Sequence, residues 1–319
     1  MKSYLLSVFA SIALAAGMYA VGVQLWGSSE FAANLDLVSF EVWIALLALS
    51  LVNYLLRFFR WTRYIALNCQ CSMPYNQHLL VYFSGFALTT TPGKAGEALR
   101  STYLNQAGVS ISNSLSALFS ERLVDLLCIV ILSLFLVNSE IGSTPLWSIP
   151  FALGVSIFVF IAIHSDTLKK VSNFLTQRSS GFLSKILSYA RSMLDASRKM
   201  LTVREFTIGS TIGFVAWFAE AFGFCILVQH LGIEVEFAIA VGIYGLAMLA
   251  GALSFIPGGL GSTELVMGGL LVAFGADQVD AITATLVCRI VTLWFAVVLG
   301  ILSAAFLAIL GITPKLSEV

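Results

Sequence analysis

The sequence predicts an all-α, polytopic integral membrane protein with about six full transmembrane helices and two re-entrant broken-helix pairs, arranged as an inverted repeat. Three observations predict this class: the composition, the length of the apolar segments and the position of the glycine-rich breaks. Of 319 residues, 59% are hydrophobic and 11% are charged, whereas soluble domains carry about 25% charged residues. A soluble chain with so few charges would expose large apolar patches. The same composition excludes a disordered chain, and a net charge of zero argues against a nucleic-acid binder.

Apolar segments of about 20 residues, the length of a membrane-spanning helix, recur along the chain. The predicted full spans are residues 4–23, 42–59, 114–137, 146–163, 206–228 and 281–310. The first span follows Lys2 and resembles a secretory signal. We expect it to be retained as a helix because several further spans follow it.

Two further apolar regions are interrupted by proline and glycine. Residues 78–91 run into Pro92, and residues 237–256 run into Pro257 ahead of a second short apolar piece. Such breaks free backbone groups that lipid cannot satisfy, so they belong where protein or water covers them. We therefore expect two re-entrant motifs, and for residues 237–256 a full crossing is the alternative. The motifs cover residues 78–104 and 237–275.

The basic residues fall on one side of this predicted topology. If each span crosses once from a cytoplasmic amino terminus, thirteen basic residues face the cytoplasm and none faces the opposite side. This asymmetry predicts that both termini lie in the cytoplasm. We expect the membrane to be the inner membrane of a bacterium. The cytoplasmic set is Lys2, Arg57, Arg60, Arg63, Lys169, Lys170, Arg178, Lys185, Arg191, Arg198, Lys199, Arg204 and Lys315.

Residues 165–205 form the only sizeable polar stretch. Apolar residues recur there at helical spacing with basic residues between them. This pattern favours an amphipathic helix on the anionic cytoplasmic leaflet, and a solvated connector between two halves is the alternative.

Two motifs recur at a nearly constant offset. Pro92 and Pro257 are 165 residues apart, and Arg122 and Arg289 are 167 residues apart. An odd number of predicted spans separates the copies, so the second copy is inverted. The predicted halves are residues 1–145 and 146–319. Inverted repeats with broken helices are the architecture of many transporters.

A charged residue within the bilayer costs several kcal/mol unless it is paired, so the remaining charges require a reason. Glu121 and Asp125 are four residues apart and therefore share a helix face, with Arg122 beside them. These charges are either internal salt bridges between the halves or a site for phosphate or carboxylate. Arg289 has no acid near it in sequence, and its alternatives for a partner are Glu97, Glu220, Glu264 and a bound anion.

The glycine-rich breaks predict an anion-binding site. Glycine allows close approach of the backbone to a ligand, and a half-helix that begins there directs N–H groups at it. The substrate-binding candidates are Lys94, Arg100, Arg122, Arg289, Gly93, Gly96, Gly258, Gly259 and Gly261. The candidates for charge balance or gating are Glu97, Glu121, Asp125 and Glu264. We find no catalytic motif, metal-ligand cluster or nucleotide loop, and we expect neither an enzyme nor a cofactor.

Three of these motifs resemble the lysylphosphatidylglycerol synthase transmembrane-region family, and the resemblance spans nearly the whole chain. The motifs are Pro92-Gly93-x-x-Gly96-Glu97-x-x-Arg100, Glu121-Arg122-x-x-Asp125 and Pro257-Gly258-Gly259-Leu260-Gly261-x-x-Glu264. The resemblance implies a flippase-like protein; members fused to a lipid aminoacyltransferase are implied to move a modified anionic phospholipid between leaflets. We expect a stand-alone member without that enzyme domain.

The sequence therefore predicts an inner-membrane lipid transporter for a phospholipid or a lipid-linked (polyprenyl or glycolipid) anionic head group. One alternative is a non-transporting membrane partner of a lipid synthase or glycosyltransferase. Another is an intramembrane lipid-modifying enzyme that uses Glu121 and Asp125. The expected partners are membrane lipids, either an anionic phospholipid or a lipid-linked sugar, and no nucleic acid. A lipid-synthesising enzyme and a second copy of the chain remain open as further partners.

Overall fold

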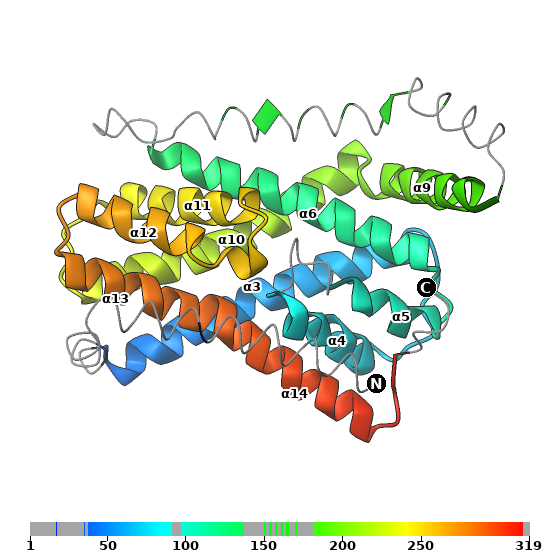
Figure 1. Ribbon diagram of the computed structural model, residues 1–319, viewed down its shortest axis with the longest axis horizontal. Helices are drawn as coiled ribbons and strands as arrows, with labels where there is room; N and C mark the ends of the chain where they lie inside the picture. Colours follow the sequence, from blue (N-terminus) through cyan, green and yellow to red (C-terminus); the bar gives the residue numbers. More distant parts are fainter. Residues whose placement is uncertain are drawn as a thin grey trace.

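The computed structural model is a bundle of helices that run along its longest axis (Figure 1). It describes residues 38–90, 97–136 and 181–314, and isolated positions between residues 17 and 35 and between 150 and 170. These residues form helices and loops, and no strand occurs among them. The all-α class predicted from the sequence is confirmed.

The long helices correspond to four of the predicted spans. They are α3 (Phe40–Ala66), α6 (Ile111–Ser133), α10 (Val203–His230) and the continuous helix of α13 (Gln278–Arg289), η5 (Ile290–Trp294) and α14 (Phe295–Ile309). Three helices in the described parts are long and apolar enough to cross a membrane: α3, α10 and α13–α14. The predicted spans at residues 4–23 and 146–163 lie outside the described residues, so the number of spans stays a prediction.

Polar side chains define where three of these helices begin. Ser110, Thr202 and Asp277 each accept a hydrogen bond from a backbone N–H of the first turn of α6, α10 and α13. These caps satisfy amide groups that have no partner within the helix. The helices therefore begin a few residues before the apolar runs from which they are predicted.

Both predicted broken-helix regions consist of short helices. The first contains α4 (Tyr75–Ser84), the turn η1 (Gly85–Leu88) and α5 (Arg100–Asn105). The second contains α11 (Phe237–Leu253), the turn η4 (Pro257–Gly259) and α12 (Ser262–Ala273). Positive φ angles of 64°, 65° and 84° occur at Gly258, Gly259 and Gly261, and only glycine adopts them without strain. Residues 91–96, which hold the first break, lie outside the described residues.

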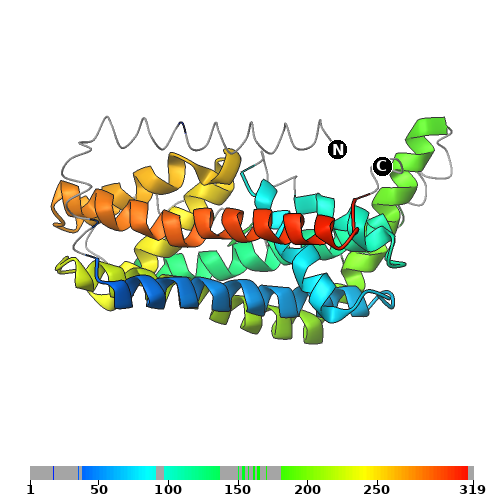
Figure 2. The same cartoon turned by 90° about the horizontal axis from the view of Figure 1, so that it is seen from below.

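The helices α3 and α10, which contain the second predicted span of each half, pair in antiparallel orientation. At one end of the pair, the Ser39 N–H donates to His230 Nε2 at 3.2 Å. At the other end, Arg63 Nε lies 2.6 Å from Glu205 Oε2. The start of α3 therefore meets the end of α10, and the two helices lie side by side (Figure 2).

Each broken region packs against the third long helix of the other predicted half. In α11, a Cβ atom at Gly245 would lie 2.6 Å from the Ser133 nitrogen of α6. In α14, a Cβ atom at Gly300 would collide with the backbone of Phe86 and Ala87 in η1. Glycine lets the backbones approach closely at both contacts. This reciprocal packing is the arrangement expected of a repeat.

The polar stretch at residues 165–205 contains one described long helix, α9 (Gly181–Met200), with Arg198 and Lys199 in its last turn. It extends from one end of the bundle (Figure 2). Its end is held to α6, because the Ser116 hydroxyl donates to the Met193 carbonyl at 3.0 Å. The predicted helix is therefore present, and its position on a membrane surface stays a prediction.

Candidate functional site

Four arginines and three acids from α3, α5, α6 and the segment before α5 form one buried group, here called the charged cluster. All except Arg122 are at most 6% exposed at their side chains, and Arg122 is 27% exposed. The formal charge of four arginines and three carboxylates is +1. Its members are Arg57, Arg60, Glu97, Arg100, Glu121, Arg122 and Asp125.

The acids of α6 lie on one helix face, as their spacing predicts, and that face meets α3. Asp125 pairs with Arg60, and its Oδ2 lies 3.0 Å from Arg57 Nη2. Glu121 accepts a hydrogen bond of 2.7 Å from the Tyr82 hydroxyl and lies 3.5 Å from Arg60 Nη2. The two carboxylates therefore share the same pair of α3 arginines.

Glu97 joins the first broken region to α6. Its Oε2 accepts a hydrogen bond of 2.6 Å from Arg122 Nη2, and it lies 3.2 Å from Arg100 Nη2. The guanidinium of Arg100 also lies over the Tyr82 ring, 4.0 Å from its centroid. A cation gains favourable energy over an aromatic face. Glu97 therefore lies between a guanidinium of α5 and one of α6, and its role in charge balance or gating stays a prediction.

Arg289 finds its partner in Glu264, one of the four alternatives left open by the sequence. Arg289 Nε donates to Glu264 Oε1 at 2.8 Å, and Arg289 Nη2 donates to the Gly258 carbonyl. The other oxygen of Glu264 accepts the Gly261 N–H at 2.7 Å. The carboxylate of Glu264 thus occupies the position beside Arg289 and the glycine-rich break. The sequence also allows a bound anion as the partner of Arg289.

The two glutamate–arginine pairs are equivalent in sequence. Glu97 and Arg122 are 25 residues apart, and so are Glu264 and Arg289. Each pair joins a glycine-rich break to the following long helix. The two motifs of the predicted repeat therefore make the same kind of contact in both halves.

Several guanidinium groups of the charged cluster have N–H groups that make no hydrogen bond. Within residues 38–90, 97–136 and 181–314, these buried atoms include Arg57 Nη2, both terminal nitrogens of Arg100 and Arg122 Nε. Arg57 Nη2 and Arg100 Nη2 lie 3.0 Å and 3.2 Å from carboxylate oxygens, but their angles do not make hydrogen bonds. Buried polar atoms without a partner are rare in proteins and indicate a water, an ion or a ligand. Planar guanidinium groups bind phosphate and carboxylate oxygens in pairs. The arrangement can therefore accept an anion with oxygens that reach these nitrogens.

Arg57 and Arg60 correct the sequence analysis, which places them among the cytoplasmic flanking residues. The structure buries both, and the side chain of Arg60 is 0% exposed. The physical reason is that α3 continues to Ala66, so that neither arginine lies at the end of the helix, and both pair with Asp125 of α6 inside the bundle. The series Ser50, Asn53, Arg57 and Arg60 advances in steps of three or four residues and so marks one polar helix face, which is the signal that could have found the two arginines.

The remaining predicted site residues belong to the two glycine-rich breaks, and the structure describes those of the second break. Gly93, Lys94 and Gly96 lie outside the described residues. Gly258, Gly259 and Gly261 form the second break beside Arg289. Over residues 38–90, 97–136 and 181–314, no group of three His, Cys, Asp or Glu side chains is placed to hold a metal ion.

The fold and the charged cluster define a polytopic helical membrane protein with buried ion pairs at broken helices. Residues 8–300 match the family described as lysylphosphatidylglycerol synthase TM region, and the chain belongs to this family. The match confirms the resemblance carried by the three sequence motifs.

Relatives differ in how much of their length is matched. A UPF0104 membrane protein of Pyrococcus horikoshii is 23% identical over 94% of this chain and 96% of its own length. A UPF0104 membrane protein of Methanothermobacter thermautotrophicus is 28% identical over 46% of this chain, and the match spans 40% of that protein. A phosphatidylglycerol lysyltransferase of Staphylococcus xylosus is 30% identical over 29% of this chain and 11% of that protein.

Proposed function

We propose that the protein is a lipid transporter, without enzymatic activity of its own, that moves a lipid with an anionic head group between leaflets of the cytoplasmic membrane. The observation that carries this proposal is the charged cluster, which has a formal charge of +1 and buried guanidinium N–H groups without hydrogen-bond partners. A phosphate oxygen is the acceptor that such groups bind best. A bound monoanion would also neutralise the cluster, which lowers the cost of holding it within a bilayer.

An inverted repeat would supply the movement. The equivalent pairs Glu97–Arg122 and Glu264–Arg289, the antiparallel α3 and α10, and the reciprocal packing of the broken regions support such a repeat. In transporters of this architecture, one repeat rocks against the other around a site near the middle of the membrane. With no ATP-binding motif in the sequence, the transporter would be a scramblase or would use an ion gradient.

The head group would be that of a phospholipid or a lipid-linked sugar, since both present a phosphate. One relative is named a phosphatidylglycerol lysyltransferase, and this name favours an anionic phospholipid. We therefore propose an anionic phospholipid as the first substrate to test.

The test is lipid translocation in vesicles of phosphatidylcholine and phosphatidylglycerol that carry a fluorescent phosphatidylglycerol analogue. A membrane-impermeant reductant that bleaches the outer leaflet reports movement of the analogue. We expect Arg122→Ala and Arg289→Ala to move it about tenfold more slowly, a factor that corresponds to roughly 1.4 kcal/mol. Arg191→Ala, at an arginine whose side chain is 42% exposed, is the control. If Arg122→Ala in the charged cluster and Arg289→Ala beside the second break both move the analogue as fast as the parent, the assigned site is wrong.

A second candidate function is favoured by α9 alone. This helix extends from the bundle and ends in two basic residues, Arg198 and Lys199 (Figure 2). Such a surface would suit a non-transporting membrane protein that holds a lipid-synthesising enzyme. In that case Arg198→Gln combined with Lys199→Gln would abolish lipid synthesis in cells, while Arg122→Ala would leave it intact.

A further inference from the structure

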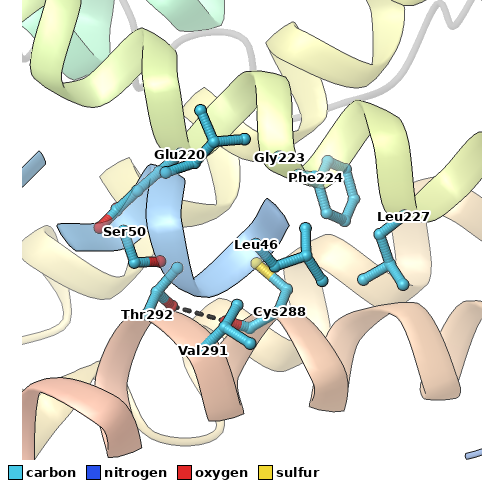
Figure 3. Close-up of a pocket in the computed structure, with 10 residues that line it drawn as sticks. Leu46, Ser50, Glu220, Gly223, Phe224, Leu227, Cys288, Val291 and Thr292 are labelled. Atoms are coloured by element: carbon cyan, nitrogen blue, oxygen red, sulfur yellow. Dashed lines mark hydrogen bonds between the residues drawn. The ribbon is translucent and has the colours of Figure 1, made fainter. Parts of the chain in front are cut away.

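A second polar site lies between α3, α10 and α13, where a small pocket is lined mainly by leucine, phenylalanine and valine side chains (Figure 3). The polar side chains in its wall are Ser50, Glu220 and Thr292, together with the thiol of Cys288. Glu220 is 6% exposed and Ser50 is 1% exposed. A carboxyl in such an apolar setting is costly when charged, and it is a candidate for a function by default.

Glu220 is connected to elements of both predicted halves. Its carboxyl group accepts a hydrogen bond from the hydroxyl of Tyr244 in α11, and in the pocket its side chain faces Ser50 of α3. The neighbouring Tyr54 of α3 donates to the Thr292 carbonyl at 2.6 Å. Thr292 lies in the π-helical turn η5, directly after Arg289. Such turns are frequent at functional sites, and this one ties the surroundings of Glu220 to the second ion pair.

A buried polar seam connects the Glu220 pocket with the charged cluster along α3 and α10. Both side-chain amide atoms of Asn53, the indole nitrogen of Trp217 and Arg57 Nη2 are buried and make no hydrogen bond. The Arg57 guanidinium lies 5.4 Å from the Trp217 ring, and Asn53 lies one turn before Arg57. Buried polar atoms of this kind are normally satisfied by ordered water. The seam therefore indicates a hydrated connection between Glu220 and the cluster.

Titratable or charged groups lie on every element that packs near Glu220. Tyr244 of α11 donates to its carboxyl group, and Cys288 of α13 lines the same pocket. Farther along these elements are Tyr54 and Arg57 of α3 and Arg289 of α13, and Asp125 of α6 pairs with Arg57 and Arg60. The cations among them already pair with Asp125 or Glu264. A change in the charge of Glu220 therefore changes the sum of charges along the seam.

We infer that Glu220 takes up and releases one proton for each monoanionic head group that the charged cluster binds. This inference rests on the proposed function. Uptake adds a proton from the aqueous side to a Glu220 carboxylate oxygen and gives a neutral carboxylic acid; release returns that proton to water on the opposite side. A protonated Glu220 leaves the +1 charge of the cluster available to the head group. Proton and anion then cross together with no net charge, which is the least costly load within a bilayer.

The chemistry of the pocket favours a proton over a metal cation. Hard cations take about six or more oxygen ligands. The pocket offers the oxygens of Ser50, Glu220 and Thr292 within otherwise apolar walls. Sodium-dependent movement of the lipid without a pH effect would overturn the inference.

The test is translocation of the fluorescent phosphatidylglycerol analogue across vesicles with a pH gradient. We expect the rate to rise severalfold when the leaflet that holds the analogue faces the acidic side, compared with equal pH. Glu220→Gln should lose this response, so that the ratio of the two rates falls to one. Glu234→Gln, at an exposed acid in the loop before α11, should respond as the parent does. A parent rate that is independent of the gradient, or a Glu220→Gln variant that still responds, would overturn the inference.

Infrared difference spectra of the detergent-solubilised protein between acid and alkaline pH provide a readout independent of lipid movement. The parent should show the C=O band of a carboxylic acid that Glu220→Gln removes. Tyr244→Phe should keep the band and shift its position, because the hydrogen bond to the carboxyl is lost. If Glu220→Gln does not fold, the shift of the band in Tyr244→Phe still assigns the band to Glu220, and an unshifted band would overturn the inference. If the band is present but the protein moves no lipid, Glu220 is a proton site and the proposed function is wrong. If the protein moves lipid but shows no such band, the proposed function stands and the inference about Glu220 is wrong.

Discussion

Asp125 is a central residue of the charged cluster, because it pairs with three arginines. Its carboxylate contacts Arg60 and Arg57 of α3, and its Oδ2 lies 3.6 Å from Arg122 Nη1. A buried charge that loses its partner costs far more than an exposed one, since water cannot reach it. The sequence identifies Asp125 as a charged residue within a span, but it does not indicate the α3 arginines that hold it.

Asp125→Asn should lower the free energy of unfolding by roughly 3–5 kcal/mol, because Arg57 and Arg60 would then be buried with too little negative charge. The measurement is thermal unfolding of the purified protein in detergent. Asp195→Asn removes an acid that is 48% exposed and 3.9 Å from Arg191, so it should change stability by at most about 1 kcal/mol. Equal stabilities for the two variants would contradict this account of the cluster.

Glu264 and Arg289 should behave as one unit. Each single change, Glu264→Leu or Arg289→Leu, leaves the other charge buried and should destabilise the protein by about 3 kcal/mol or more. The double variant removes both charges and should recover at least half of that loss. Additive losses in thermal unfolding would show that the pair of 2.8 Å does not couple the two residues.

The residue scale also shows where sequence analysis reaches its limit. Intramembrane charges such as Glu121, Arg122 and Arg289 are visible in the sequence because they interrupt apolar runs. Arg57 and Arg60 lie near the end of an apolar run, where hydropathy alone does not distinguish a flanking arginine from a buried one; only the polar face that they share with Ser50 and Asn53 does. The choice of Glu264 over Glu97 and Glu220 as the partner of Arg289 depends on how the second break folds back, which no local pattern encodes.

At the scale of elements, close contacts between helices depend on glycine. Gly245 places α11 against the backbone of Leu132 and Ser133 in α6. The apolar lengths of α3, α10 and α13–α14 are predictable from hydropathy, and the breaks are predictable from proline and glycine. The π-helical turn η5 and the packing of each broken region on the opposite half are not predictable, because both arise from contacts between distant segments.

Gly245→Ala should destabilise the protein by about 1–3 kcal/mol, since the added methyl group would lie 2.6 Å from the Ser133 nitrogen and force the helices apart. Thermal unfolding in detergent measures this change. Gly269→Ala in α12 is the matched control, because no atom lies within 4 Å of the added group. It should be neutral or slightly stabilising, since alanine favours helix. A loss for Gly269→Ala as large as that for Gly245→Ala would contradict the contact.

At the scale of the whole molecule, the proposed inverted repeat makes a prediction about sidedness. The start of α6 and the start of α13 occupy equivalent positions in the two halves. In an inverted repeat these positions face opposite sides of the membrane. The distribution of basic residues predicts that the start of α6 lies in the cytoplasm.

Single cysteines at these positions test the prediction. In a background whose five natural cysteines are replaced, Ser110→Cys should react with a membrane-impermeant maleimide only from the cytoplasmic side. Gln278→Cys should react only from the opposite side. Both positions are exposed in the structure. Labelling of both from the same side would rule out an inverted repeat.

The central claim, that the charged cluster binds an anionic lipid head group, is tested most directly by native mass spectrometry of the protein purified in mild detergent with a mixture of phosphatidylglycerol and phosphatidylcholine. We predict that the parent retains phosphatidylglycerol selectively. Arg57→Gln combined with Arg100→Gln removes Arg57 Nη2 and both terminal nitrogens of Arg100, which make no hydrogen bond within the part of the chain that the structure describes. This double variant should lose the selectivity, while Arg191→Gln should keep it. Equal retention of the two lipids by the parent, or unchanged selectivity in the double variant, would contradict the claim.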